Sequence, residues 1–346
     1  MRPKLRTGVP VLWRTDDLLQ FGTDPTRAAA IPCTLTEQSW LLSLDGSRTR
    51  GDAVAAGANQ GLSPGRGEQL LTLLQQVGAL EDAGVNVPEL GRATPDERTR
   101  LAPDIAAASL ALGTPGAGAI NMSARRQAVV EVRGTGRVAA ATIGLLAAAG
   151  IGRLTVSSQP TCAEISPFTA GLGATATMRA VVERCSPSTV VQEIGSRVSA
   201  HPPHVVVLAD RQHQQAQDTE ALVAADVPHL LVHAVGHRIA VGPLVVPGVT
   251  ACLRCIYLSR RDRDPTWSRQ SAQLTHRTDE GPVDTVLATL AGALAARRVL
   301  GVIEHDRSDG AGFPGAGTCL EYEMLTQEFS TRTWLPHPIC GCTWPG

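Results

Sequence analysis

A chain of 346 residues, of which 43% are hydrophobic, is long enough for two or three domains with a substantial core. Its formal net charge of -1 excludes the basic surface that nonspecific binding to nucleic acid or to an anionic membrane requires. The longest apolar run, Val138 to Gly152, is too short to span a bilayer and fits a buried helix. The first residues lead into a polar segment, not into the apolar core of a signal peptide. We therefore expect a soluble, cytoplasmic protein with no nucleic-acid or membrane partner.

Residues 1–85 are expected to form a winged-helix-like domain. Three strand-like runs, GVPVLWRT, LLQFGTD and AAAIPC, precede Thr34 and Glu37, which have the spacing of a capping box at the start of a helix. A second helix is expected over 51–59, and a third carries leucines on one face, including Leu70 and Leu74. Residues 86–125 are rich in glycine, proline and charge, and we expect a linker there.

From residue 126 to residue 346 the pattern alternates between strands and helices and predicts an α/β sheet. Strands are expected in AVVEVRG, RLTVSS, STVVQEI, HVVVLAD and HLLVHAV. Helices are expected over 137–150, 175–184 and 213–225, and an alanine-rich helix over 283–300. A last strand, CLEYEML, precedes the tail HPICGC. The fold class is therefore α/β.

A glycine turn joins the first strand of this sheet to its first helix. Gly134 and Gly136 permit the tight turn and the close approach of phosphate that a nucleotide-binding βαβ unit uses. The acid that would hold a ribose is missing, because the second strand ends at Ser157 and Ser158. The turn alone is also explained by the packing of strand against helix.

Four of the eight cysteines form two close pairs. Cys252 and Cys255 lie in a C-x-x-C, and Cys340 and Cys342 flank a glycine in the tail. Two such pairs complete a tetrahedral thiolate site, so we expect a structural zinc ion that is closed to water. The alternative is that all four are reduced surface thiols.

The run from Val129 to about Cys255 resembles the ThiF/MoeB adenylyltransferases of the ubiquitin-activating-enzyme-like superfamily. The family's G-x-G-G-x-G falls on Gly134 to Ala139, where Arg137 takes the fourth position, and its AGVG falls on Ala149 to Gly152. The resemblance implies that Asp210 serves magnesium and the nucleotide, and that the cysteine pairs fix the tail to the core. The family's ribose acids fall on Ser158 and Pro160, and its lysine falls near Ala174. We therefore expect MgATP to bind weakly or not at all.

The first 85 residues resemble the PqqD-like domains that recognise leader peptides. Such domains bind a peptide as an added strand beside the third helix. The resemblance implies a site along the third strand, with Ala28, Ala29 and Ala30 at its edge and Leu70 and Leu74 lining apolar pockets. Leucines at helical spacing more commonly face the core, so that alternative stays open.

The whole chain resembles the leader-peptide-binding, ThiF-like partner proteins of azoline-forming cyclodehydratases. Our first hypothesis is a noncatalytic, homodimeric protein that binds a leader-like peptide and presents it to a separate modifying enzyme. The second is an ATP-dependent adenylyltransferase that activates a carboxylate of a small protein or peptide, in which Arg137 or Arg153 replaces the lysine. The third is a structural homodimer.

Overall fold

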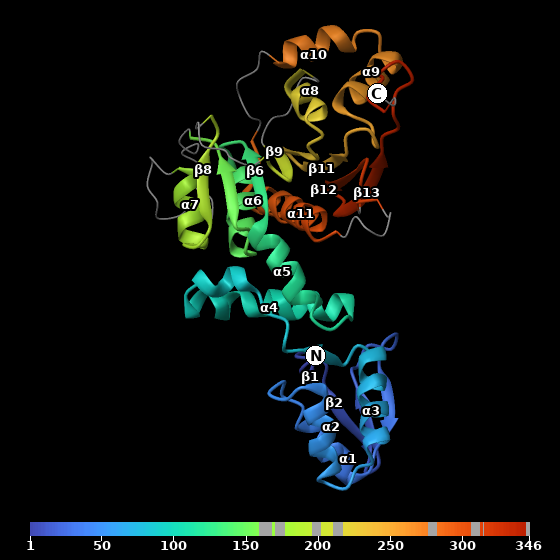
Figure 1. The fold of residues 1–346 in the computed structure, drawn as a ribbon. Helices are drawn as coiled ribbons and strands as arrows, with labels where there is room; N and C mark the ends of the chain where they lie inside the picture. Colours follow the sequence, from blue (N-terminus) through green and yellow to red (C-terminus); the bar gives the residue numbers. More distant parts are fainter. Residues whose placement is uncertain are drawn as a thin grey trace. The chain divides into compact units, whose positions relative to one another are not determined.

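The structure is a computed structural model with two compact units, Met1–Ala124 (the first unit) and Arg125–Gly346 (the second unit), shown in Figure 1. It describes residues 1–158, 168–169, 177–195, 202–209, 217–275, 282–305, 312–313 and 315–343. Each unit is described by itself below.

The first unit begins with two small sheets and three helices. Its three-stranded antiparallel sheet has the order β2-β3-β4, and a separate pair joins β1 to β5. The elements are β1 (Pro3–Leu5), β2 (Val11–Thr15), β3 (Leu18–Phe21), β4 (Ala29–Pro32), α1 (Leu35–Leu42), α2 (Arg50–Ala58), α3 (Pro64–Gln76) and β5 (Leu80–Asp82). The three predicted strands and three predicted helices are present.

Local caps and one buried tryptophan organise these helices. Thr34 and Glu37 form the predicted capping box, in which each side chain accepts a hydrogen bond from the other residue's backbone N–H. Trp40 is fully buried, and its indole N–H donates to the carbonyl oxygen of Ala53 in α2 at 2.8 Å. A Cβ at Gly57 would lie 2.9 Å from the Trp40 ring nitrogen, so the α1–α2 contact requires a glycine there. The core beneath the sheet includes Leu19, Phe21, Ile31, Leu41, Leu70, Leu71 and Leu74.

The segment for which a linker is predicted, 86–125, is largely helical. It contains a 3-10 helix (Pro88–Arg92), α4 (Pro95–Leu112) and most of α5 (Ala117–Gln127). Leu101 and Met122 are buried in a small core that these helices share. Thr94 caps α4 by accepting from the Glu97 N–H, a start signal that the high proline and glycine content masks.

The second unit is built on one sheet with eight strands in its described part, in the order β13-β12-β11-β10-β9-β6-β7-β8. The strands β10, β9, β6, β7 and β8 run parallel, and β11, β12 and β13 add to them antiparallel. Their bounds are β6 Val129–Arg133, β7 Arg153–Val156, β8 Val190–Glu193, β9 Val205–Ala209, β10 His229–Val235, β11 Arg238–Val245, β12 Thr318–Glu323 and β13 Glu328–Thr333. The predicted α/β sheet is confirmed.

Helices cover both faces of this sheet (Figure 1). They are α6 (Arg137–Ala148), α7 (Met178–Cys185), α8 (Gln217–Ala224), α9 (Leu253–Arg263), α10 (Trp267–Thr275) and α11 (Thr285–Glu304). On one face, α6, α7 and α11 enclose the main core with Val130, Val132 and Leu230 of the strands. On the other, Leu222 of α8 packs on Val206 and Leu208.

In the described part of the chain, α11 alone is long and apolar enough to cross a membrane, and half of its apolar stretch is buried inside the protein. Its Ala291, Ala295 and Val299 belong to the main core with α6. Helix packing against the sheet thus accounts for its apolar composition.

Candidate functional site

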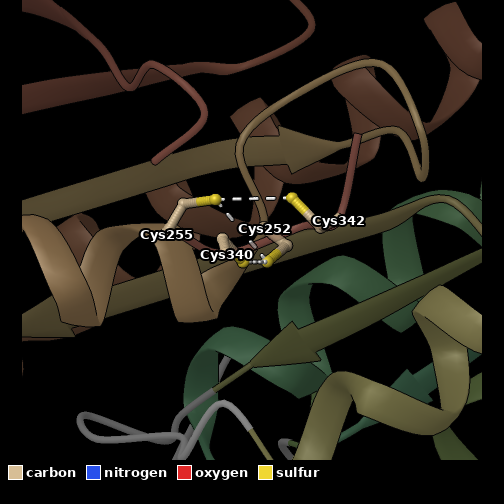
Figure 2. Close-up of side chains that lie close together, drawn as sticks. All are labelled: Cys252, Cys255, Cys340 and Cys342. Carbon is tan, nitrogen blue, oxygen red and sulfur yellow. Dashed lines mark hydrogen bonds between the residues drawn. The ribbon is translucent and has the colours of Figure 1, made fainter. Parts of the chain in front are cut away.

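The structure brings the four predicted cysteines together between α9 and the tail. Cys252 is the N-cap residue of α9 and Cys255 lies in its first turn, where a tight loop is predicted. Sγ of Cys252 lies 3.9 Å from that of Cys255 and 3.5 Å from that of Cys340, and Cys255 and Cys342 are 3.4 Å apart. All four sulfur atoms lie within 4.8 Å of one another and point toward one centre (Figure 2).

This geometry suits a tetrahedral metal ion. A zinc–sulfur distance of about 2.3 Å places the sulfur atoms of a regular tetrahedron about 3.8 Å apart, which is close to the observed separations. Cys252 and Cys255 are buried, and the other two are half-buried, so water has little access. The cluster could therefore hold a metal ion of the structural kind.

Hydrogen bonding separates the acidities of these thiols. The Cys252 thiol donates to Cys255 Sγ, which raises the pKa of Cys252 far above its usual range and lowers the pKa of Cys255 to about 4. Burial raises the pKa of Cys340 to about 11. Cys255 is thus the thiol of this pair that ionises more readily, and the thiolate is the form that binds metal.

Further contacts fix the tail beside the cluster. His337 Nε2 lies 2.8 Å from Asp262 Oδ2 in α9, and Trp334 packs against the buried cysteines. The Arg260 guanidinium stacks between two indoles, 5.0 Å from the Trp267 ring centre and 5.7 Å from that of Trp334. Side chains that precede Cys340 in the tail, Trp334 and His337, therefore also hold the tail to α9.

The glycine turn is shaped by packing at the carboxyl end of β6. Gly134 has φ 149°, and a Cβ there would lie 2.6 Å from the Ala209 carbonyl oxygen of β9 and 3.1 Å from Ala139 Cβ of α6. Gly136 is the N-cap of α6. Strand and helix approach so closely that Gly134 is required whether or not a phosphate binds.

Hydroxyl groups stand next to this turn. The strand β7 ends at Val156, and Ser157 Oγ accepts a hydrogen bond from the Gly134 N–H at 3.4 Å. Ser158 follows and is exposed. Neither residue offers the carboxylate that holds a ribose in a dinucleotide fold. Asp210, Pro160 and Ala174, which also bear on nucleotide binding, lie outside the described residues.

The two arginines considered as substitutes for the lysine have other positions. Arg137 Nη1 donates to the Val283 carbonyl oxygen at 3.0 Å and to Thr285 Oγ1 at 3.3 Å, which ties it to the start of α11. Arg153 is paired with Val129, at the amino end of the parallel strands, whereas the turn follows their carboxyl end. Roughly 15 Å of strand therefore separates Arg153 from the turn.

In the first unit, β4 is one of the two edge strands of the sheet β2-β3-β4, so one backbone edge of β4 has no partner strand among the described residues. Ala29 and Ala30 lie on this strand, and Ala28 precedes it. The Cys33 N–H donates to the carbonyl oxygen of Asp17, toward β3. Because successive N–H groups of an antiparallel strand point alternately toward and away from the neighbouring strand, the Ala30 N–H points away from β3, to the outer edge. Arg66 reaches from α3 to the end of the same edge, where its Nη2 donates to the Pro32 carbonyl oxygen at 2.8 Å.

A cavity of about 860 Å³, the first-unit cavity, lies beside the beginning of this edge. Its lining includes Phe21, Ala28, Ala29, Val77, Leu110 and Leu112. The wall formed by Leu110 and Leu112 of α4 was not predicted, because α4 falls in the expected linker. Leu70 and Leu74 are fully buried and belong to the core, so they offer no pocket to a peptide; the pockets expected at these two leucines are absent.

A second cavity, the second-unit cavity, has a volume of about 920 Å³. It is lined by residues of β10 to β13 and by residues of α9 and α10. Arg260, Trp267 and Trp334 line it together with charged side chains of both signs. No sequence pattern indicated it, because its lining is collected from elements more than 90 residues apart in the chain, such as His233 and Ser330.

No protein-family model matches the chain, and no curated protein matches it. Solved structures do match the chain. They include MccB of E. coli with ATP (14% identity, TM-score 0.63, 99% of each chain covered) and the microcin C7 biosynthetic enzyme MccB with N-formylated MccA (14%, 0.63, 99% of this chain and 100% of that one). PaaA matches at 13% identity with a TM-score of 0.67, over 94% of this chain and 98% of that one. The whole chain therefore has an α/β fold like that of MccB.

Proposed function

We propose that this protein binds a leader-like peptide through its first unit and presents it to a separate peptide-modifying enzyme of the cyclodehydratase type. In this proposal the second unit is a noncatalytic, zinc-containing scaffold, and the protein works as a homodimer in the cytoplasm. The observation that carries the proposal is the edge of β4 beside the first-unit cavity, which has no partner strand in the described part of the chain.

The edge offers a peptide what an added strand needs. The outward N–H of Ala30 can pair with an extended chain, and small side chains at Ala28, Ala29 and Ala30 leave room for it. The first-unit cavity next to the edge has apolar walls from Phe21 and Leu110 that suit alternate side chains of such a strand. A strand that binds in this way gains affinity from backbone bonds and specificity from the cavity.

The order of three strands and three helices in the first unit supports a PqqD-like, winged-helix-like assignment. The complex of the related fold MccB with MccA gives an independent reason to expect a ligand beyond a nucleotide. We extend this expectation to a leader-like peptide for the present chain.

Zinc is the metal that we propose for the cysteine cluster. Four thiolates in a closed tetrahedron are the ligand set of structural zinc, and they leave no position for a substrate. We expect one zinc ion per chain, held by Cys252, Cys255, Cys340 and Cys342, which metal analysis of purified protein would measure.

The residues at the glycine turn support a noncatalytic role. Adenylation requires several positive groups and a metal around the developing phosphate charge. Arg137 is bonded to the start of α11, Arg153 lies at the opposite end of its strand, and the only lysine is Lys4. Ser157 and Ser158 supply no carboxylate for a ribose.

An ATP-dependent adenylyltransferase is the second candidate, and the complex of MccB with ATP favours it. Under this candidate Gly134, Gly136 and Asp210 would serve the nucleotide. Pyrophosphate exchange, together with a micromolar dissociation constant for MgATP that is lost in Asp210→Ala, would select this candidate over the noncatalytic one. Self-association without peptide or ATP binding would select a structural homodimer.

The peptide proposal is tested with a fluorescent leader peptide encoded beside this gene. We expect wild type to bind it and Ala30→Pro to lose at least about tenfold in affinity, because proline removes the outward N–H. Ala30→Ser keeps that N–H and is the matched control, for which we expect binding within about twofold of wild type. Equal binding by wild type and the proline variant, with unchanged circular dichroism, would refute the β4 site.

A further inference from the structure

Arg6 is a buried cation in the wall of the first-unit cavity. Its side chain is only 2% exposed, and the residue belongs to the lining of the cavity. One side of the guanidinium is engaged, because Nη2 donates to the Leu80 carbonyl oxygen at 2.9 Å and Nε lies 3.5 Å from Glu81 Oε2. Nη1 donates no hydrogen bond in the part of the chain that the structure describes. A buried side chain thus keeps a free donor at this wall.

An acceptor without a partner faces the same space. The carbonyl oxygen of Gly113, which follows the last turn of α4, accepts no hydrogen bond from the described residues. A Cβ at Gly78 would lie 3.6 Å from Arg6 Nη1 and 3.7 Å from the Gly113 oxygen. Both glycines line the cavity and have a left-handed backbone, with φ of 69° and 71°. The lack of side chains at these two positions therefore leaves a gap between a donor and an acceptor.

The charges around this gap disfavour an ionic ligand. Burial lowers the pKa of the Arg6 guanidinium from its usual value, and the Glu81 carboxylate beside it acts in the opposite direction. A ligand carboxylate would approach Glu81 and the negative end of α4. A ligand cation would approach Arg6 and Arg27, which both line the cavity. An apolar group would remove water from the free donor and acceptor without replacing its hydrogen bonds.

We propose that the first-unit cavity binds a side-chain amide, of asparagine or glutamine, in the gap beside Gly78. A carboxamide is neutral and carries both groups that the gap needs, an oxygen that accepts from Arg6 Nη1 and an NH2 that donates to the Gly113 carbonyl oxygen. That the amide belongs to a peptide rests on the proposed function. The preference for an amide rests on Arg6 and Gly113, and not on the edge of β4.

Three pools of nonapeptides test this preference on the full chain. All are acetylated, end in an amide and have random neutral flanks without asparagine or glutamine, so that only the central residue differs. It is asparagine or glutamine in the first pool, aspartate or glutamate in the second, and leucine or methionine in the third, which keeps the side-chain size similar. Affinity-selection mass spectrometry should find the first pool retained about tenfold more than either of the others by wild type. Equal retention, or a preference for the second or third pool, would overturn the inference.

Gly78→Asn places an amide of the chain itself in the gap, and asparagine tolerates a left-handed backbone. We expect this variant to reduce the preference to less than about twofold. Gly248→Asn is the matched control, because Gly248 has a φ of 72° and a Cβ there would meet nothing within 4 Å. It should behave as wild type. An undiminished preference in Gly78→Asn would contradict the amide site.

Arg6→Met removes the donor and should also lose the preference, with circular dichroism as the check on folding. Gly78→Asn leaves Arg6 and its ion pair in place, so it tests the site even where the loss of Arg6 unfolds the first unit. A folded Arg6→Met variant that still prefers the first pool would exclude Arg6 as the donor and overturn the assignment.

The outcome is distinguishable from that of the leader-peptide experiment. If Ala30→Pro leaves leader binding unchanged while Gly78→Asn abolishes the amide preference, the β4 site fails and the amide site stands. If the proline variant loses leader binding and wild type does not distinguish the pools, the β4 site stands and the amide site fails.

Discussion

The cysteine cluster and the outer edge of β4 use different parts of the chain's chemistry. The cluster depends on four side chains, and any other residue type at those positions would remove a ligand. The edge of β4 depends on backbone groups, and the residues at its start, Ala29 and Ala30, have side chains with almost no chemistry of their own. A site made from side chains can therefore be recognised in a sequence by residue type and spacing, whereas a site made from backbone can be recognised only through topology.

Substitution in the cysteine cluster tests the side-chain half of this comparison and should have the largest effect. Because a structural metal site contributes its binding free energy to folding, Cys252→Ser with Cys340→Ser should abolish bound metal and cost more than about 4 kcal/mol of stability. Metal analysis and thermal unfolding measure both. Cys185→Ser in α7, outside the cluster, should keep the metal. A double variant that retains its full metal content would break the comparison.

Gly134→Ala tests a second position at which the backbone decides. The new Cβ would meet the Ala209 carbonyl oxygen at 2.6 Å at a φ of 149°, so we expect a loss on the order of 2 kcal/mol. The loss should be equal with and without MgATP in a urea titration, since the cause is packing. Gly136 has an ordinary φ of -83°, so Gly136→Ala should lose only a small part of the stability that Gly134→Ala loses. Unchanged stability of Gly134→Ala would mean that the turn is kept for a ligand.

Glu37 connects the two kinds of site, because its side chain holds Arg66, which bonds to the end of the β4 edge. Its carboxylate accepts from Arg66 Nε at 2.7 Å and from the Thr34 N–H at 2.8 Å, and Arg66 in turn bonds to Pro32 of β4. We expect Glu37→Gln to cost about 1.5 kcal/mol at pH 7. Glu68→Gln, in an exposed ion pair with Arg50, should cost less than about 0.5 kcal/mol.

The same carboxylate predicts a pH dependence. Burial raises the pKa of Glu37, but the hydrogen bonds from Arg66 and Thr34 outweigh it and the pKa lies below its usual value. Its contribution is therefore present above a pH of about 4.3 and is lost as the pH falls through the lowered pKa. The stabilities from urea titrations of wild type and Glu37→Gln should converge as the pH falls through the lowered pKa. A stability difference that grows on acidification would contradict this assignment.

These features differ in how far the sequence could predict them. The spacing of Thr34 and Glu37 and that of the cysteines carried enough chemistry to find a helix start and a metal cluster. The helices α4 and α5 were missed because proline, glycine and charge dominate a segment whose few buried residues, such as Leu101 and Met122, are far apart. Leu70 and Leu74 show the limit of periodicity, which indicates a shared face but not what covers it.

The pairing of Cys252 with Cys340 links residues 88 positions apart, and that of Cys255 with Cys342 links residues 87 apart. A metal at this point would enclose α9, α10, α11, β12 and β13 in one covalent and coordinate ring. Closing a ring of this size removes roughly 4 to 5 kcal/mol of conformational entropy from the unfolded chain, by analogy with a disulfide. During synthesis the ring can close only after Cys340 and Cys342 have left the ribosome. The last strand of the sheet, β13, ends at Thr333 and leaves before them, so metal capture would lock a sheet whose strands have all been synthesised.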